Sequence, residues 1–343
     1  MASPGAARAP AKLGEDATIA RYFAPLTTGL PGAYGLKDDA ASITPPAGHD
    51  LVVTTDALIA GVHFFPDDDP ADIAWKALAV NVSDLAAKAA TPIAYSVALA
   101  LTRSTDEAWL KAFTDGLGAA QALLGICLSG GDTTASPAGP IMISITAFGS
   151  VPAGRMVRRG GAQAGDSLFV TGTIGDGALG LFIRAGSLES TAWPLTDAGR
   201  RALLSRYLRP TPRLALRDAL LAHANAAMDI SDGLAIDCAR MCAASGISAR
   251  IEAACVPLSD PARAVVGSDP ALVETILTGG DDYEVLAAIR AGEEDAFIHA
   301  AMVAGVDVSR IGVLEAVGDG LSIIGPNGAK MMLSRLGYDH LAH

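Results

Sequence analysis

Strand-like apolar runs that end in an aspartate recur along this chain, and a helix-like segment lies between the first two. Residues 50–56, DLVVTTD, are rich in β-branched residues, and residues 125–132, GICLSGGD, are predicted to run as a strand into a glycine turn and an acid. Residues 72–91 have apolar side chains at helical spacing, with Asp72 as the predicted N-cap. Other predicted elements are a strand at 93–101, a helix at about 106–124 and a strand at 141–151. This alternation predicts an α/β or α+β unit.

A connector rich in glycine and arginine, PAGRMVRRGGAQAGD at 152–166, separates this unit from the rest of the chain. A new strand, SLFVTG, follows the connector. The 343 residues are enough for about two domains of ordinary size. We therefore predict a flexible arm over residues 1–12, an N-terminal domain over 13–151 and a C-terminal domain over 152–343.

Composition excludes several classes of protein. The formal net charge of −12 argues against a nucleic-acid partner, because a phosphate backbone is bound by clustered lysine and arginine. There is no uninterrupted apolar run of about 18 residues, so no membrane span is predicted. The N-terminal sequence lacks the apolar region of a secretory signal. The four cysteines form no C-x-x-C motif and are predicted to be buried thiols in a reducing cytoplasm.

Six short segments carry the aspartates that stand out, and we predict most of them to be turns. They are LKDDAA (36–41), TTDAL (54–58), NVSDLAAK (81–88), SGGDTT (129–134), DISDG (229–233) and TGGDDYE (278–284). Carboxylates, hydroxyls and carbonyls without histidine or cysteine are the ligands of a hard cation such as Mg²⁺. Each segment alone is also typical of a plain turn or helix cap, so this alternative stays open.

Asp84 is harder to explain as a turn residue. It lies within a predicted helix of otherwise apolar character, where a buried carboxylate is costly unless it is paired or bound to a metal. Asn81 lies three residues earlier and therefore shares its helix face. These two polar side chains predict a site on one side of the helix.

Three other features have ordinary explanations. The glycines at 172, 175 and 177 follow a strand like a dinucleotide-binding loop, but their spacing is not G-x-G-x-x-G. The acidic run at 66–72 is typical of a solvated turn with a helix cap, and the arginines at 200–217 are typical of a solvated helix face. A P-loop motif is absent from the sequence.

The chain closely resembles the thiamine-monophosphate kinases of the aminoimidazole-ribonucleotide-synthase-like superfamily. The matching motifs occur in order over nearly the whole chain: KDDAA, TTDALIAGVHF, DPADIAWKALAVNVSDLAAKAATP, SGGDTT, GRMVRRGG, MDISDGL, TGGDDYE and GYDH. The resemblance implies an N-terminal ATP- and metal-binding domain that forms a β-barrel across a homodimer, and a C-terminal α+β domain. It also implies ATP-dependent phosphorylation of thiamine monophosphate to thiamine diphosphate, the last step of thiamine diphosphate biosynthesis, with several Mg²⁺ ions.

The resemblance further implies a role for each matching residue. The expected metal ligands are Asp39, Thr54, Thr55, Asp56, Asp84, Asp132, Asp229 and Asp232. The expected ATP contacts are Gly131, Asp132, Arg159 and Ser231, and the expected substrate contacts are His63, Asp281 and Tyr338. The transfer is expected to be metal-assisted and to need no general base.

Two residues depart from the family pattern. Lys37 stands where the family usually has a glycine before the aspartate pair, which would strain the backbone if φ were positive there. Asp281 stands where the family tends to have a glutamate, which shortens the side chain by one methylene. The alternative functions are another ATP-dependent synthetase of the same superfamily and a nicotinamide-dependent oxidoreductase built on the glycine loop at 172–177.

Overall fold

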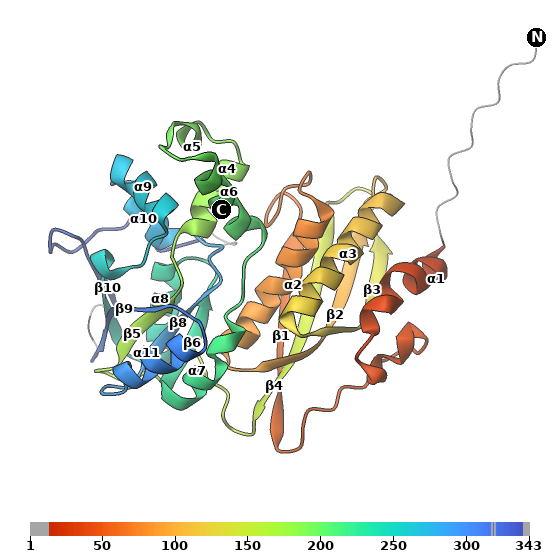
Figure 1. Cartoon of the computed structure of the whole chain (residues 1–343), viewed down its shortest axis with the longest axis horizontal. Coiled ribbons are helices and arrows are strands. Elements are labelled where there is room, and N and C mark those ends of the chain that lie inside the picture. Colours follow the sequence, from red (N-terminus) through yellow and green to blue (C-terminus); the bar gives the residue numbers. More distant parts are fainter. Residues whose placement is uncertain (1–13, 317, 319, 339–343) are drawn as a thin grey trace, which may run out of the picture.

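The structure is a computed structural model that describes residues 14–316, 318 and 320–338. The arm predicted over residues 1–12 lies outside the described residues. Two domains of mixed α/β content lie side by side, each built on one sheet, and residues 153–166 join the two sheets (Figure 1). The predicted two-domain fold is therefore confirmed in outline, while its domain limits stay a prediction.

The N-terminal domain is a four-stranded sheet in the order β1-β4-β2-β3. Its strands are β1 (His49–Ile59), β2 (Thr91–Leu101), β3 (Cys127–Ala135) and β4 (Met142–Pro152). Strand β4 pairs antiparallel with β1 and β2, and β2 pairs parallel with β3. Helices α2 (Pro70–Ala87) and α3 (Glu107–Leu124) cover one face (Figure 1). Short helical turns precede β1, at α1 (Glu15–Thr18), Ile19–Phe23, Ala24–Thr27 and Pro31–Leu36.

Two of the predicted acidic turns are strands. Asp56 pairs with Ile145 inside β1, and Asp132 pairs with Ala98 inside β3. Pairing continues past each acid because a partner strand extends beside it. A Cβ at Gly131 would lie 1.9 Å from the Val97 carbonyl oxygen, so glycine there permits close strand contact and makes no turn.

Helix α2 begins earlier than the sequence predicts. The side chain of Asp69, not Asp72, is the N-cap, because its Oδ1 accepts the Ala71 N–H at 2.8 Å and Pro70 opens the helix. Nearly every later position is buried, since α2 packs on the N-terminal sheet and also contacts β6 (Ala224–Ile230) and β8 (Glu284–Ile289) of the other domain. A helix enclosed in this way can present side chains to both domains.

The C-terminal domain is a six-stranded sheet in the order β10-β7-β9-β5-β8-β6. Its strands are β5 (Ser167–Thr171), β6 (Ala224–Ile230), β7 (Ser248–Glu252), β8 (Glu284–Ile289), β9 (Val308–Glu315) and β10 (Leu321–Ile324). Strand β10 is parallel to β7, and the remaining pairs are antiparallel. The helices are α4 (Asp176–Arg184), α5 (Leu188–Ala192), α6 (Asp197–Leu208), α7 (Arg217–His223), α8 (Leu234–Ser245), α9 (Asp260–Ser268), α10 (Leu272–Thr278) and α11 (Glu294–Val303). Short 3₁₀ turns occur at Leu214–Leu216 and Ala253–Cys255.

The prediction of a solvated arginine face at 200–217 is wrong for two arginines. Arg206 and Arg213 both pair with Glu284, whose side chain is fully buried at the start of β8. Thr171 Oγ1 also donates to Glu284 Oε2, at 2.5 Å. The acidic run at 66–72 is not fully solvated either, because Asp68 is buried and pairs with Arg184 at 2.5 Å.

Replacement of Glu284 by glutamine should lower the free energy of unfolding by about 3 kcal/mol, because it leaves two arginines facing a neutral group. Urea titration followed by circular dichroism measures this loss. The pair of Arg217 with the exposed Asp218 is the control, since Asp218→Asn should leave stability unchanged within error. Equal unfolding midpoints for Glu284→Gln and the wild type would contradict a structural role for the buried pair.

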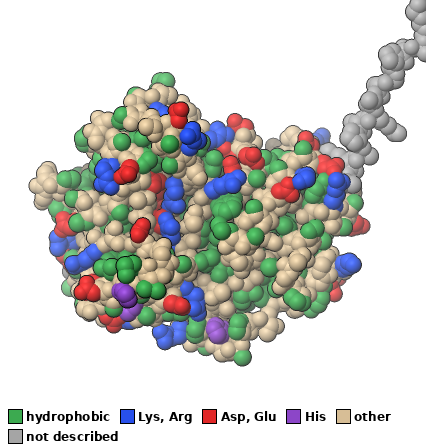
Figure 2. All heavy atoms as spheres, viewed as in Figure 1, with side chains coloured by type: hydrophobic (Ala, Val, Ile, Leu, Met, Phe, Trp, Pro, Cys, Tyr) green, Lys and Arg blue, Asp and Glu red, His purple; other side chains and the backbone are tan. Residues whose placement is uncertain are grey.

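Acidic and basic side chains are interspersed on the face of the molecule shown in Figure 2. Each helix within the described residues is too short or too polar to cross a lipid bilayer. Cys238 and Cys242 are buried, whereas Cys127 is partly exposed and Cys255 is exposed, so the prediction of four buried thiols is wrong for two.

Candidate functional site

The DISDG turn holds two aspartates at the end of β6. Asp229 is buried on the strand, and the turn after it is fixed by Asp237, whose Oδ2 accepts the N–H groups of Ser231 and Asp232 at 3.0 Å each. Arg240 pairs with both Asp232 and Asp237. The turn is therefore preorganised by a carboxylate one helical turn into α8.

Helix α2 connects this turn to strand β1. Ser83 Oγ donates to Asp229 Oδ2 at 2.8 Å, and the next residue, Asp84, accepts from Thr54 Oγ1 at 2.5 Å. Asn81 Oδ1 accepts the Asp56 N–H at 3.0 Å. Polar side chains at three positions of α2 thus bind both domains, which explains why an apolar helix carries them.

These elements surround a cavity of about 460 Å³ between the domains, here called the interdomain cavity. Four of the predicted metal ligands line it, namely Asp56, Asp84, Asp229 and Asp232. The predicted ATP contacts Arg159 and Ser231 and the predicted substrate contacts His63, Asp281 and Tyr338 also line it. Side chains from distant parts of the sequence are thereby brought to one place.

The four aspartates of the interdomain cavity repel one another. Burial raises the pKa of Asp56 to about 6, and the charges of Asp84 and Asp232 add to the increase. Burial likewise raises the pKa of Asp229, and the Asp84 charge adds to it. Carboxylates held together at this cost are stabilised in their ionised form by a bound cation.

The donor set fits Mg²⁺. This ion is usually held by one or two carboxylates, several waters and substrate phosphates, rather than by a complete protein cage. Within the described part of the chain, no three histidine, cysteine or acidic side chains are arranged to hold an ion by themselves. The carboxylates Asp56, Asp84, Asp229 and Asp232 would therefore share the ion with phosphate oxygens.

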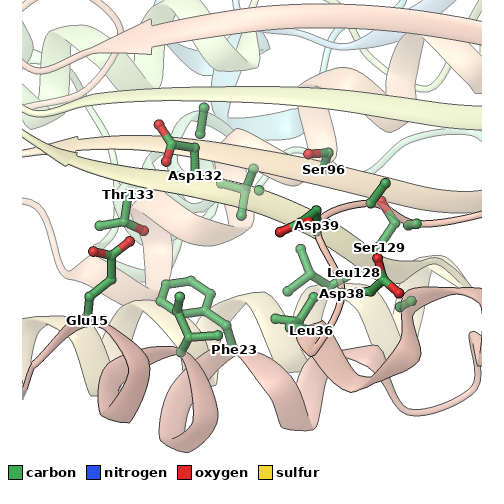
Figure 3. A pocket seen from close by; sticks show the side chains of 18 residues that line it. Glu15, Phe23, Leu36, Asp38, Asp39, Ser96, Leu128, Ser129, Asp132 and Thr133 are labelled. Atoms are coloured by element: carbon green, nitrogen blue, oxygen red, sulfur yellow. The ribbon is translucent and has the colours of Figure 1, made fainter.

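A second cavity, of about 550 Å³, contains the other predicted acids and is here called the N-terminal cavity (Figure 3). Asp38, Asp39 and Asp132 line it together with Gly131. In Figure 3, Phe23 and Leu36 lie on its helical side, opposite the strands. The predicted metal ligands are thus divided between two cavities, with Asp39 and Asp132 in the N-terminal one.

Strand geometry explains the division. Asp56 lies on β1 and Asp132 on β3, and these are the two edge strands of the N-terminal sheet. Thr54 and Thr55 are also separated, because alternate residues of a strand point to opposite faces. Thr54 faces α2, whereas Thr55 is exposed and its Oγ1 lies 2.8 Å from Thr146 Oγ1.

The two departures from the family pattern have different consequences. Lys37 has a φ of −105°, so the lysine is unstrained, and the positive φ of 57° belongs to Leu36. Asp281 has a φ of 69°, which is strained for a residue with a side chain. It is held there by its own N–H, which donates to the Ser231 carbonyl oxygen at 2.9 Å.

N–H donors of the glycine loop at 172–177 are already used in hydrogen bonds within the chain. Both carboxylate oxygens of Asp282 accept N–H groups at the start of α4, from Gly175 at 2.8 Å and from Gly177 at 3.1 Å. These are the donors that a dinucleotide-binding loop would direct at a pyrophosphate. The geometry therefore argues against the oxidoreductase alternative.

Sequence reasoning missed three residues of this region. Asp237 fixes the DISDG turn, Asp282 caps α4, and Lys76 lies nearly buried in the wall of the interdomain cavity. The available signal was the same for Asp237 and Lys76, a charged residue within an apolar helical stretch. Asp282 lies beside Asp281 in the TGGDDYE segment, and the sequence alone does not distinguish the roles of the two carboxylates.

Mg²⁺ should raise the melting temperature, and the rise should be larger at about pH 7.5 than at about pH 5. The pKa of Asp56 is raised from 3.8 to about 6, so the metal-free protein loses stability as pH rises through this window. Above pH 6 a bound ion compensates the repulsion between the ionised aspartates. Below pH 6 protons compete with the ion for the Asp56 carboxylate. Thermal unfolding at both pH values measures the effect, with the exposed Asp115→Asn as control. An equal rise at both pH values would exclude Asp56 as a ligand.

The fold is that of the AIR synthase related proteins, as comparison with models of known families shows. The N-terminal domain of AIR synthase related proteins matches residues 37–151, and the C-terminal domain of the same proteins matches residues 163–324.

Individual relatives narrow the class. The thiamine-monophosphate kinase of Caulobacter vibrioides is 43% identical over 94% of this chain and 89% of its own length. The crystal structure of the Stenotrophomonas maltophilia K279a enzyme of that name is 41% identical, with a TM-score of 0.76 over 86% of this chain and 91% of that one. A structure described as AaThiL complexed with AMPPCP and TMP is 31% identical, with a TM-score of 0.74 over 88% of this chain and 91% of that one. The chain belongs to the thiamine-monophosphate kinase family.

Proposed function

We propose that this protein transfers the γ-phosphoryl group of ATP to thiamine monophosphate, giving thiamine diphosphate and ADP in the cytoplasm. The observation that carries the proposal is the convergence of four aspartates with His63, Asp281 and Tyr338 on the interdomain cavity. Membership of the family supports the proposal, because relatives of this chain are named thiamine-monophosphate kinase. The structure of one relative contains AMPPCP and TMP.

The aspartates need a cation to accept such substrates. Two phosphate-bearing substrates would be repelled by Asp56, Asp84, Asp229 and Asp232. Bound Mg²⁺ would neutralise the phosphates and supply the charge stabilisation on which phosphoryl transfer depends. The protein's part is positioning: Asp237 holds the DISDG turn and Ser83 holds Asp229, so the carboxylates are fixed before substrates arrive.

A general base is not required. The acceptor is a phosphate monoester with a second pKa near 6, so its attacking oxygen is already largely ionised at neutral pH. We therefore propose a direct in-line transfer without a phosphoenzyme. Arg159, which is exposed at the wall of the interdomain cavity, would contact the ATP phosphates.

A homodimer would unite the two acidic cavities. The face of the N-terminal sheet opposite α2 exposes apolar side chains, with Leu51 39% and Val53 54% exposed. The edges β1 and β3 lack a neighbouring strand within the described chain. We propose that two copies close into a barrel, with β1 of one beside β3 of the other. Asp132 of one copy would then meet Asp56 of its partner.

Product analysis tests the proposed function. The purified protein is mixed with Mg-ATP and thiamine monophosphate, and thiamine diphosphate and ADP are quantified by chromatography. We expect equal amounts of the two products, and no ³²P-labelled protein when the acceptor is omitted. ADP formed only with an amide or carboxylate acceptor would favour the synthetase alternative, and labelled protein would contradict direct transfer.

A further inference from the structure

Lys76 is a charged residue without an assigned role, and only 3% of it is exposed. It lies on α2 one and two helical turns before Val80 and Asp84, and all three side chains line the interdomain cavity. Burial of an ammonium group is costly, and an apolar residue of similar size often stabilises a protein better. A buried lysine in a cavity wall therefore points to a task other than stability.

The ammonium of Lys76 contacts two groups from the C-terminal domain. Its Nζ lies 2.8 Å from Asp281 Oδ1 and 3.7 Å from the centre of the Tyr207 ring. The contact with Asp281 is an ion pair, and Nζ makes no hydrogen bond within the described residues. Lys76 is thus held by charge and by the ring face, with donors still available.

The Asp281 contact orients a predicted substrate contact. Two groups approach Asp281 Oδ1, the Lys76 ammonium at 2.8 Å and the Tyr283 hydroxyl at 3.4 Å. A carboxylate has two oxygens, so the positions around Oδ2 can receive a ligand. The backbone of Asp281 is in the left-handed region, with a φ of 69°, and its N–H donates to the Ser231 carbonyl oxygen, so the DISDG turn fixes the position of this carboxylate.

Through Tyr207, Lys76 is also connected to His63, the second predicted substrate contact. The Tyr207 hydroxyl lies 3.5 Å from the His63 carbonyl oxygen, to which it donates, and its ring meets Phe65 edge-on with centres 6.5 Å apart. The loop that carries His63 therefore rests on the ring that Lys76 contacts. One ammonium group thus contacts Asp281 directly and also contacts the ring that supports the His63 loop.

The position of Lys76 along α2 indicates which end of thiamine monophosphate would lie near it. Lys76 lies eight positions before Asp84, which corresponds to about 12 Å along the helix axis. The acceptor phosphate would lie near the aspartates, and the predicted substrate contacts Asp281 and His63 lie at the Lys76 end, so the heterocyclic end would extend toward Lys76. We propose, building on the proposed function, that Lys76 is a positioning residue that sets specificity for the acceptor by fixing Asp281 and the His63 loop.

The test compares acceptor and ATP in the same assay. For Lys76→Met we expect the KM for thiamine monophosphate to rise about tenfold or more, while the KM for ATP and the melting temperature change little. Lys76→Arg keeps the charge and should recover part of the affinity. Lys111→Met, which removes an exposed lysine of α3, is the matched control. Calorimetric binding of thiamine monophosphate in the presence of Mg²⁺ repeats the comparison without turnover.

A double-mutant cycle tests whether Lys76 acts through Asp281. The variant with both Lys76→Met and Asp281→Asn should lose less acceptor affinity than the sum of the two single losses, because only the effect of Lys76 on the His63 loop remains when Asp281 is already changed. Additive losses, unchanged acceptor affinity in Lys76→Met, or an equal rise of both KM values with a lower melting temperature would each overturn the proposal. Lack of thiamine diphosphate from the wild type contradicts the proposed function instead, and calorimetry then still decides the role of Lys76. A wild type that binds no thiamine monophosphate would overturn both.

Discussion

Replacement of Asp84 by asparagine should lower kcat by about a thousandfold, the size of effect produced by removing one preorganised electrostatic group from a transfer site. Asparagine keeps the shape of the side chain, so the hydrogen bond from Thr54 Oγ1, 2.5 Å long in the wild type, can still form. What is lost is one negative charge at the point where α2, β1 and the DISDG turn meet. The rate of thiamine diphosphate formation at limiting and saturating Mg²⁺ measures the effect.

Two comparisons make this result specific to metal binding. Ser83→Ala removes the neighbouring hydrogen bond to Asp229 without removing charge, so its rate loss should be much smaller than that of Asp84→Asn. The Asp84→Asn protein should also need more Mg²⁺ for half-maximal rate. If Asp84→Asn kept a near wild-type rate at limiting Mg²⁺, the carboxylate would not be a ligand.

The sequence predicted the elements of the fold better than the place of the acids within them. Helix and strand periodicity located β2, β4 and α3 to within two residues at each end. The acids of β1 and β3 were assigned to strand ends because aspartate beside threonine or glycine is common in turns. Only the pairing of β4 with β1 and of β3 with β2 keeps these residues in strands, and pairing is a tertiary property.

The candidate site was predictable as a list of residues but not as a geometry. Motif resemblance supplied Asp56, Asp84, Asp229 and Asp232, which line one cavity. The same list included Asp132, which the order of strands places at the opposite edge of the sheet. Lys76 was missed because a lysine in an apolar helix is ordinarily expected to extend to solvent, and its burial depends on a domain that follows much later in the chain.

Pairing of two inactive variants should restore activity if the site is shared between subunits. Asp56→Asn and Asp132→Asn are each expected to be inactive as homodimers, because each would remove a proposed metal ligand from both sites. In a heterodimer of the two variants, one site combines the intact Asp56 of one chain with the intact Asp132 of the other. Such heterodimers, coexpressed with two different affinity tags and purified on both, should have about half of the wild-type rate.

The reciprocal pair separates a shared site from a site within one chain. A heterodimer of the wild-type chain and a chain carrying both substitutions has no intact shared site, so it should be inactive. If each site used Asp56 and Asp132 of one chain, this heterodimer would keep half of the rate and the first pair would have none. The separation of the two acids on edge strands β1 and β3 favours the shared site, because only a second sheet can place a neighbour beside both edges. Light scattering of each purified pair, which has to give the mass of a dimer, ensures that the rates refer to dimers.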